Sequence, residues 1–152
     1  MLDNSAATRR LPRETRYSEP RLLVIDDDNF TIMAVRRKIR QLGFSIDFDH
    51  ATDGVDGMHC LWHPVYGAPA TILLDYHMPR MNGVEMLCRM DTMAERAQID
   101  VFLMTSSDIP RSSFDGVASS VAGFIVKDLN FQGLEAALIR HQSRHEHLAR
   151  TA

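Results

Sequence analysis

The sequence has little cysteine, little tryptophan and no long run of apolar residues. Its two cysteines, Cys60 and Cys88, fall on different predicted helices and form neither a CxxC pair nor a zinc-ligand spacing. We therefore expect two reduced thiols in a cytoplasmic protein rather than a disulfide framework. No apolar run approaches the roughly 20 residues that a membrane-spanning helix needs, so no membrane partner is expected.

Basic residues are not in excess either, because the net charge is −3 at pH 7. This balance does not point to direct nucleic-acid binding. Residues 1–19 hold four arginines but lack the apolar core of a secretory signal, and they predict a flexible leader. A chain of 152 residues suits one folded domain, which we place at 20–148, followed by a short tail at 149–152.

Short apolar runs alternate along the chain with stretches whose apolar residues recur at helical spacing. The first run, RLLVI at 21–25, is a buried-strand candidate, and the stretch after it places Ile32, Val35 and Ile39 on one helical face. The predicted strands are 21–25, 45–50, 70–74, 99–104 and 123–126, and the predicted helices are 29–42, 55–62, 83–93, 112–120 and 131–147.

This alternation predicts an α/β fold, a doubly wound (βα)5 three-layer sandwich with a parallel sheet. The first, third and fourth runs are continuously apolar, as expected of strands buried on both faces, so they should be central. The weaker second and fifth runs should be the edges. The order that fits is 2-1-3-4-5, the flavodoxin-like order, in which ligands bind at the carboxyl ends of the strands.

Polar side chains follow four of the five predicted strands. They are Asp26 to Asp28 after the first, Asp75 after the third, Thr105 after the fourth and Lys127 after the fifth. In a parallel sheet these ends share one rim, so acids, a hydroxyl and an ammonium converge there. Clustered carboxylates suit Mg²⁺, and a carboxylate can attack phosphorus to give an aspartyl phosphate. The ammonium would then offset charge on the phosphoryl oxygens.

Four segments resemble the bacterial two-component response-regulator receiver family, of the chemotaxis-regulator type. They are LLVIDDD at 22–28, LLDYHMPRMNG at 73–83, LMTSSD at 103–108 and FIVKD at 124–128, in the family's order. The resemblance covers about residues 21–141 and implies that the domain at 20–148 is a receiver.

The resemblance implies that Asp75 is the phosphoacceptor and part of a Mg²⁺ (or Mn²⁺) site. Asp27 would bind the cation directly, Asp26 would bind it through water, and the backbone carbonyl of His77 would complete the protein ligands. The distance to the end of the first helix favours Asp26 and Asp27 as the acidic pair. Asp28 is then expected to cap that helix.

The resemblance also implies a switch. Thr105 would move toward the phosphoryl group and leave room into which Phe124 can turn, while Lys127 pairs with the phosphoryl charge. The side chains of His77 and Ser107 would tune the lifetime of the phosphoryl group.

The sequence departs from the family at Asp128, where a proline with a cis bond is usual. A non-proline cis bond costs about 2.5–4 kcal/mol, so the Lys127–Asp128 bond is expected to be trans. The stretch at 63–70 is longer than usual. His141 and His145 have the i, i+4 spacing of metal ligands, but a solvated helix face is the favoured interpretation.

The implied function is phosphorelay signalling by a phosphoacceptor domain rather than an enzyme. Asp75 would take a phosphoryl group from a phosphohistidine on a sensor histidine kinase or phosphotransfer protein, and the domain would assist its own phosphorylation and dephosphorylation. This would change a surface of the fourth helix, fifth strand and fifth helix that binds a downstream protein target or forms a homodimer.

Two alternatives stay open. The chain could be the receiver fragment of a longer regulator, although no output domain fits in the residues after Lys127. It could also be a pseudo-receiver that is not phosphorylated. The complete set of site residues argues against this, whereas Asp128 in place of the usual proline is compatible with it. A haloacid-dehalogenase-like phosphatase would need a second aspartate where His77 stands.

Overall fold

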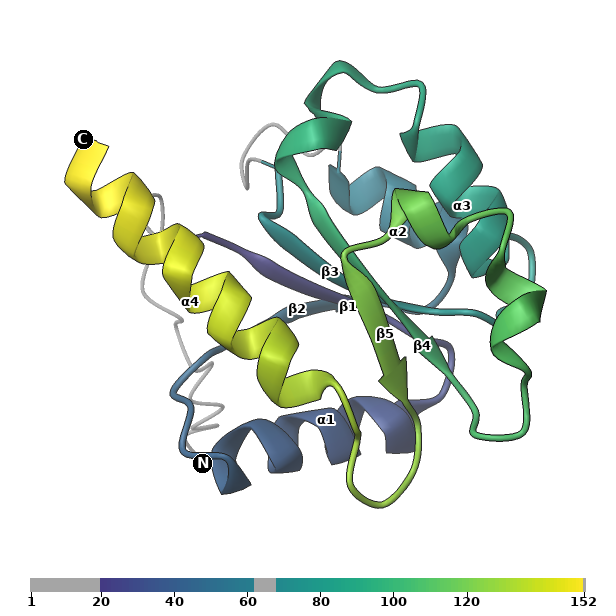
Figure 1. The fold of residues 1–152 in the computed structure, drawn as a ribbon, viewed down its shortest axis with the longest axis horizontal. Helices are drawn as coiled ribbons and strands as arrows, with labels where there is room; N and C mark the ends of the chain where they lie inside the picture. Colours follow the sequence, from purple (N-terminus) through teal and green to yellow (C-terminus); the bar gives the residue numbers. More distant parts are fainter. Residues whose placement is uncertain (1–19, 62–67, 152) are drawn as a thin grey trace, which may run out of the picture.

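The computed structural model describes residues 20–61 and 68–151. Its strands are β1 (Leu22–Ile25), β2 (Asp49–Ala51), β3 (Thr71–Asp75), β4 (Asp100–Thr105) and β5 (Gly123–Val126). They form a parallel sheet in the order β2-β1-β3-β4-β5 (Figure 1). β1, β3 and β4 are central, and β2 and β5 are the edges. The predicted fold class and strand order are therefore confirmed.

The two faces of the sheet are covered by helices. Within the described residues the α-helices are α1 (Asn29–Gln41), α2 (Gly54–Leu61), α3 (Gly83–Met90) and α4 (Leu134–Thr151). α1 and α4 lie on one face, and α2 and α3 lie on the other (Figure 1). Short 3-10 helices occupy the connections around β4: η2 (Ala94–Gln98), η3 (Arg111–Phe114) and η4 (Ala118–Ser120). None of the helices in these segments is long and apolar enough to cross a bilayer.

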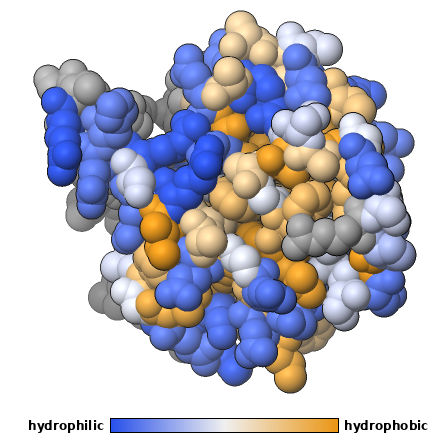
Figure 2. Space-filling model, in the orientation of Figure 1, coloured by the Kyte–Doolittle hydropathy of each residue, from blue (hydrophilic) through white to orange (hydrophobic). Residues whose placement is uncertain are grey.

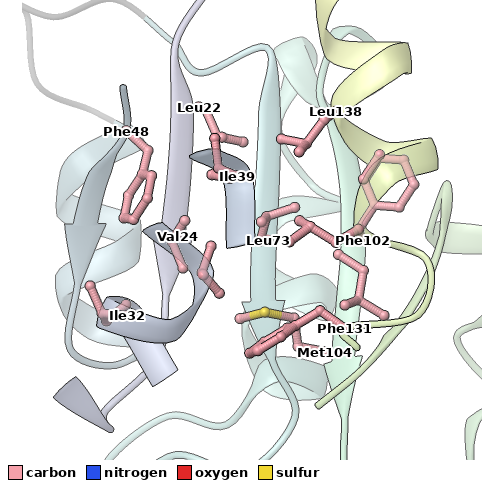
Figure 3. Close-up of a cluster of buried hydrophobic side chains, with 14 residues drawn as sticks. Leu22, Val24, Ile32, Ile39, Phe48, Leu73, Phe102, Met104, Phe131 and Leu138 are labelled. Carbon is pink, nitrogen blue, oxygen red and sulfur yellow. The ribbon is translucent and has the colours of Figure 1, made fainter. Parts of the chain in front are cut away.

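Burial on both faces explains the unbroken apolar sequence of the central strands. Leu22 and Val24 of β1 pack with Leu73 of β3 and with side chains of α1 and α4 (Figure 3). The intervening residues Leu23 and Ile25 belong to the second cluster, under α2 and α3. Successive side chains of a strand point to opposite faces, so both sets have to be apolar.

Local sequence signals set the ends of α1 and the start of α3. Asp28 caps α1 by accepting a hydrogen bond from Phe30 N–H, as predicted. Gly43 follows that helix with a φ of 83°, a left-handed conformation that suits glycine. α3 begins with a capping box in which Asn82 and Glu85 each accept from the other's backbone N–H.

The predicted helix at 112–120 is wrong. The segment forms η3 and η4 instead, because its serines, glycine and valine are weak helix formers. The predicted output surface of fourth helix, fifth strand and fifth helix is corrected accordingly, since its first element is an irregular segment.

Two further boundaries differ from the prediction. Only the end of the predicted strand at 45–50 pairs with β1, because β2 is a short edge strand that begins at Asp49. Phe48 is buried among the side chains that α1 and α4 cover, so the apolar alternation at 45–48 reflects side-chain packing on the sheet and not backbone pairing with β1. The last helix begins after Phe131 and Gly133, which both have positive φ, and it continues to Thr151.

The two cysteines are free thiols on different helices, as predicted. Cys60 is half-buried on α2 and Cys88 is exposed on α3. The predicted leader at 1–19 and most of the unusually long stretch at 63–70 lie outside the described residues.

Candidate functional site

Lys127 joins two aspartates that lie far from it in the sequence. Its Nζ donates to Asp26 Oδ2 and to Asp75 Oδ1, each at 3.0 Å. Asp26 follows β1, Asp75 ends β3 and Lys127 follows β5, so three strand ends supply the cluster. Both aspartates are buried, with 1% and 3% exposure. The structure thus brings these three predicted residues together at one rim.

The cluster contains a third carboxylate. Oxygens of Asp26, Asp27 and Asp75 all lie within 4.8 Å of one another, and Asp27 is the exposed member. Hard oxygen donors in this small space fit Mg²⁺ or Mn²⁺, which would complete its shell with water. The backbone carbonyl of His77, in the loop after β3, stays a predicted ligand.

Burial makes the ionised carboxylates costly at this site. Burial, together with the charge of Asp26, raises the pKa of Asp75 to about 6. Burial also raises the pKa of Asp26, although the hydrogen bond from Asp28 N–H and the charge of Lys127 oppose it. For Lys127 burial alone would lower the pKa, but the hydrogen bonds and charges of Asp75 and Asp26 outweigh it and raise the pKa. The ammonium is therefore charged, and a bound dication would favour ionised aspartates.

The loop after β1 separates the roles of its three aspartates. Asp26 N–H donates to Ala51 O at 3.1 Å, and Asp26 Oδ1 accepts from Asp28 N–H at 2.8 Å, which holds Asp26 inward. Asp28 accepts from Phe30 N–H at 3.0 Å, and this hydrogen bond is the main reason that the pKa of Asp28 is lowered. Asp27 lies between them and is exposed. This arrangement agrees with Asp26 and Asp27 as the acidic pair.

Thr105 ends β4 next to the cluster and is 6% exposed. Its carbonyl accepts from Lys127 N–H at 2.7 Å, and the carbonyl of the preceding Met104 accepts from Tyr76 N–H at 3.0 Å. The backbone around Thr105 is thus tied both to the lysine and to the loop after Asp75. The role of its hydroxyl stays a prediction.

An aromatic chain leads from the loop after Asp75 to Phe124. The Tyr76 ring packs edge-on against His77, with centroids 4.5 Å apart, and against Phe114, at 5.0 Å. Phe114 lies 5.4 Å from Phe124 and is 2% exposed, although the serines beside it in η3 are exposed. Phe114 is not among the predicted site residues; a lone aromatic residue in a stretch of serine, glycine and valine was the available signal.

The remaining loop predictions have mixed outcomes. His77 and Ser107 are exposed after β3 and β4, and their tuning roles stay predictions. Residues 20–61 and 68–151 contain no cis peptide bond, so the Lys127–Asp128 bond is trans, as predicted. Asp128 accepts from Asn130 N–H at 2.9 Å and so caps its own loop.

The predicted solvation of His141 is wrong. This residue is 5% exposed, and its Nδ1 lies 2.9 Å from Thr71 Oγ1 at the amino end of β3. It shares the buried stripe of α4 with Leu134 and Leu138, so packing on the sheet decides its position. The side chain of His145 is outside the part of the chain that the structure describes.

Comparison with known proteins gives a consistent assignment. A family profile for the response regulator receiver domain matches residues 22–139. The transcriptional regulatory protein PrrA of Mycobacterium leprae is 28% identical over 132 residues, which cover 85% of this chain and 54% of PrrA. The transcriptional regulatory protein QseB of Haemophilus influenzae is 28% identical over 130 residues, which cover 84% of this chain and 56% of QseB. The chain spans about half the length of these relatives.

Solved structures share the fold. A two-component response regulator from Legionella pneumophila superposes with a TM-score of 0.68 at 23% identity and covers 82% of this chain and 99% of its own. A two-component response regulator from Cytophaga hutchinsonii has a TM-score of 0.69 at 22% identity and covers 82% of this chain and 98% of its own. At these identities the likeness establishes the fold.

Proposed function

The chain belongs to the response-regulator receiver family, and on this premise we propose that Asp75 accepts a phosphoryl group from a phosphohistidine on a sensor histidine kinase or phosphotransfer protein. The contact of Lys127 Nζ with both Asp75 and Asp26, at 3.0 Å each, carries the proposal. This contact combines a nucleophile, a cation and an acidic metal ligand at one rim.

The transfer is proposed as a displacement at phosphorus. An oxygen of the Asp75 carboxylate attacks, the O–P bond forms as the N–P bond to the donor imidazole breaks, and the imidazole keeps the electron pair and takes up a proton. Lys127 has three N–H donors, of which two face Asp26 and Asp75, so within the described residues a third remains to donate to a phosphoryl oxygen. Bound Mg²⁺ or Mn²⁺, held by Asp26, Asp27 and Asp75, would further offset the phosphoryl charge.

Thr105 and Phe124 are proposed to report the phosphoryl group to the rest of the domain. Phosphorylation adds about −1.5 to −2 charge, to which the Thr105 hydroxyl can donate a hydrogen bond. Phe124, half-buried against Phe114, is proposed to turn when Thr105 moves toward the phosphoryl group. This turn would shift an existing conformational equilibrium of the domain toward its active surface. His77 and Ser107 are proposed to limit the access of water, and with it the rate of phosphoryl loss.

The responsive surface is proposed to lie around β5, with the segment 109–122 in place of a fourth helix. Figure 2 shows hydrophobic residues gathered over the middle of the face on which Figure 1 places β5. Val117, Val121 and Phe124 are partly buried hydrophobic residues of this region. Such a surface suits a downstream protein target or a second copy of the chain better than nucleic acid.

A second arrangement has specific support. The relatives PrrA and QseB are named transcriptional regulatory proteins, and the matched region is about half of each. If this chain is the receiver part of such a regulator, the surface around β5 would contact an output domain of the same polypeptide. In both arrangements we place the phosphoryl transfer in the cytoplasm, where the two free thiols would stay reduced.

The test is reaction with a small acyl phosphate and Mg²⁺, and separately with beryllofluoride, a mimic of the phosphoryl group. Intact mass should show one phosphoryl group on the wild type and none on Asp75→Asn. Beryllofluoride should shift the amide NMR signals of Thr105 and Phe124 in the wild type alone. A wild type that stays unmodified at saturating donor and Mg²⁺ would refute the proposal and favour a pseudo-receiver.

A further inference from the structure

The loop after β3 contains an arginine in an unfavourable backbone conformation. Arg80 has a φ of 62°, in the left-handed region that costs a non-glycine residue energy. Gly43 and Gly133 occupy comparable positive φ values elsewhere in the chain. A non-glycine residue persists in this conformation where its surroundings hold it there. The side-chain contacts of Arg80 identify what holds it.

Arg80 binds two acids at the start of α2. Its Nε donates to Asp53 Oδ2 at 2.6 Å, and its Nη2 also contacts Asp53 and lies 3.3 Å from Asp56 Oδ1. Asp53 is 3% exposed, and its Oδ1 caps α2 by accepting from Val55 and Asp56 N–H at 2.9 and 3.0 Å. Burial alone would raise the pKa of Asp53, but the hydrogen bonds from Asp56 N–H and Arg80 outweigh it and lower the pKa. Asp53 is therefore a charged anchor for Arg80.

Backbone contacts continue this link toward Asp75. Gly54 N–H donates to Met81 O at 3.2 Å, so the residue after Asp53 is bonded to the residue after Arg80. At the other end of the loop, Gly83 packs so closely on the carbonyl of Asp75 that a Cβ would collide with it. The loop that follows Asp75 thus ends, at Gly83, in contact with the carbonyl of Asp75. Between these two points, Arg80 attaches the loop to the start of α2.

We propose that Arg80 is a positioning residue for the acceptor loop. Its ion pairs with Asp53 and Asp56 hold the loop, and with it the Asp75 carboxylate and the His77 carbonyl, in the geometry needed for cation binding and phosphoryl transfer. The inference rests on the proposed function. Arg80 itself contacts acids at the start of α2, so it acts on the site through the loop.

Four substitutions separate the ion pair from the backbone conformation. Arg80→Gly removes the side chain but suits a φ of 62°, whereas Arg80→Ala removes the side chain and keeps the strain. Asp53→Asn keeps the oxygen that caps α2, but its amide nitrogen cannot accept from Arg80. Arg89→Ala, at an exposed position on α3, is the matched control for the loss of one positive charge.

Two functional readouts and one structural readout are needed. Mg²⁺ affinity is measured by NMR titration without donor, and the phosphorylation rate is measured by intact mass at saturating Mg²⁺ and acyl phosphate. Arg80→Gly, Arg80→Ala and Asp53→Asn should each bind Mg²⁺ about tenfold more weakly, as expected when the support of metal ligands is lost, and should react more slowly. The Gly54 amide should exchange faster with solvent in all three variants, while Arg89→Ala should behave as the wild type.

Wild-type Mg²⁺ affinity and Gly54 exchange in either Arg80→Gly or Asp53→Asn would overturn the inference, because the ion pair would then be dispensable. Failure of the proposed function has a different signature. In that case the wild type is not phosphorylated at all, while the Mg²⁺ affinities and the Gly54 exchange of the variants still decide whether Arg80 positions the loop.

Discussion

Lys127 Nζ and Asp75 Oδ1 lie 3.0 Å apart, although 52 residues separate them in the chain. The contact forms because β3 and β5 flank β4 and end on the same rim of a parallel sheet. The same ammonium faces Asp26, so one positive charge meets two buried carboxylates. The excess of negative charge favours the binding of a cation. It also helps to raise the pKa of Asp75 to about 6, so that its ionisation changes near this pH.

Phosphorylation of Asp75 by a small acyl phosphate should become faster as the pH rises from about 5 to about 7. The carboxylate form attacks phosphorus, and the pKa of Asp75 is raised to about 6, so the reactive fraction grows through this window. Mg²⁺ favours the ionised form and should move the midpoint to lower pH. Initial rates over this range at two Mg²⁺ concentrations check the prediction, and a flat profile would contradict it.

Asp75→Asn should stabilise the fold at neutral pH when Mg²⁺ is absent. The pKa of Asp75 is about 6 in the folded protein against an ordinary value of 3.8, so its ionisation destabilises the folded state increasingly as the pH rises between these values. Removing the charge should add about 1–3 kcal/mol to the free energy of unfolding at pH 7. Urea denaturation at pH 7 and near 4 is the measurement, with Asp115→Asn as an exposed control. The gain should disappear at the lower pH; a loss of stability at pH 7 would count against the burial argument.

Lys127→Ala should impair phosphorylation more than it impairs Mg²⁺ binding. The substitution removes a donor to the phosphoryl oxygens, for which a loss of about 100-fold in rate is expected. The three carboxylates that would hold Mg²⁺ remain, so its affinity should change less. Rates by intact mass and affinities by NMR separate the two effects, and Lys38→Ala on α1 is the control. An unchanged phosphorylation rate and an unchanged Phe124 signal would show that the assigned role is wrong.

The rim could be predicted from the sequence because it is built on strand ends. Asp26, Asp75 and Lys127 each follow a short run consistent with a strand, and strand order alone makes them neighbours. The link between Arg80 and Asp53 could not be predicted in this way. Both lie in loops, 27 positions apart, and neither the φ of Arg80 nor the burial of Asp53 has a periodic signal.

The incorrectly predicted helix at 112–120 shows that packed side chains can recur at helical spacing without a continuous helix. Phe114, Val117 and Val121 are spaced as on one helical face, and all three do pack on the second cluster. The residues between them are mainly small and polar, however, and η3 and η4 reach the same packing without a continuous helix. The helical spacing of these apolar side chains therefore does not require a helical backbone.

Phe114→Ala should loosen the segment 109–122 and disconnect Tyr76 from Phe124. The ring is 2% exposed and contacts both aromatic residues, so its loss should cost about 3–5 kcal/mol of stability, as for other buried phenylalanines. Hydrogen exchange should accelerate first at amides of this segment. Phe114→Leu should recover part of the stability, and Ser113→Ala should have little effect. Exchange in the segment that matches the wild type would show that Phe114 is not its anchor.

Asp100→Asn should weaken the attachment of α4. Asp100 Oδ2 accepts from Arg140 Nε and Arg144 Nε at 2.7 Å each, and the arginines are partly exposed, so a loss of about 1–2 kcal/mol is expected at pH 7. Burial alone would raise the pKa of Asp100, but the hydrogen bonds from Arg140 and Arg144 outweigh it and lower the pKa below 3.8. This stabilisation is therefore present above pH 3.8 and lost as the pH falls through the lowered pKa. Thermal unfolding of both proteins should differ at pH 7 and converge in strong acid, whereas convergence at neutral pH would contradict the role of the ion pairs.

Phe30→Ala should slow phosphoryl transfer from a phosphorylated histidine phosphotransfer domain without changing the reaction with a small acyl phosphate. Phe30 and Met33 of α1 are 82% and 68% exposed, and Leu129, in the loop after Lys127, is 98% exposed. Large apolar side chains on α1, which follows the loop of Asp26 and Asp27, and on the loop after Lys127 favour contact with a protein donor, which a small donor does not need. A loss of about tenfold in kcat/KM is expected for the protein donor, as for the minority of interface residues whose truncation costs more than about 1 kcal/mol. Ile139→Ala, 53% exposed on α4, is the apolar control. An equal loss with both donors would place the effect of Phe30 inside the site, and no loss with the protein donor would place the donor elsewhere on the domain.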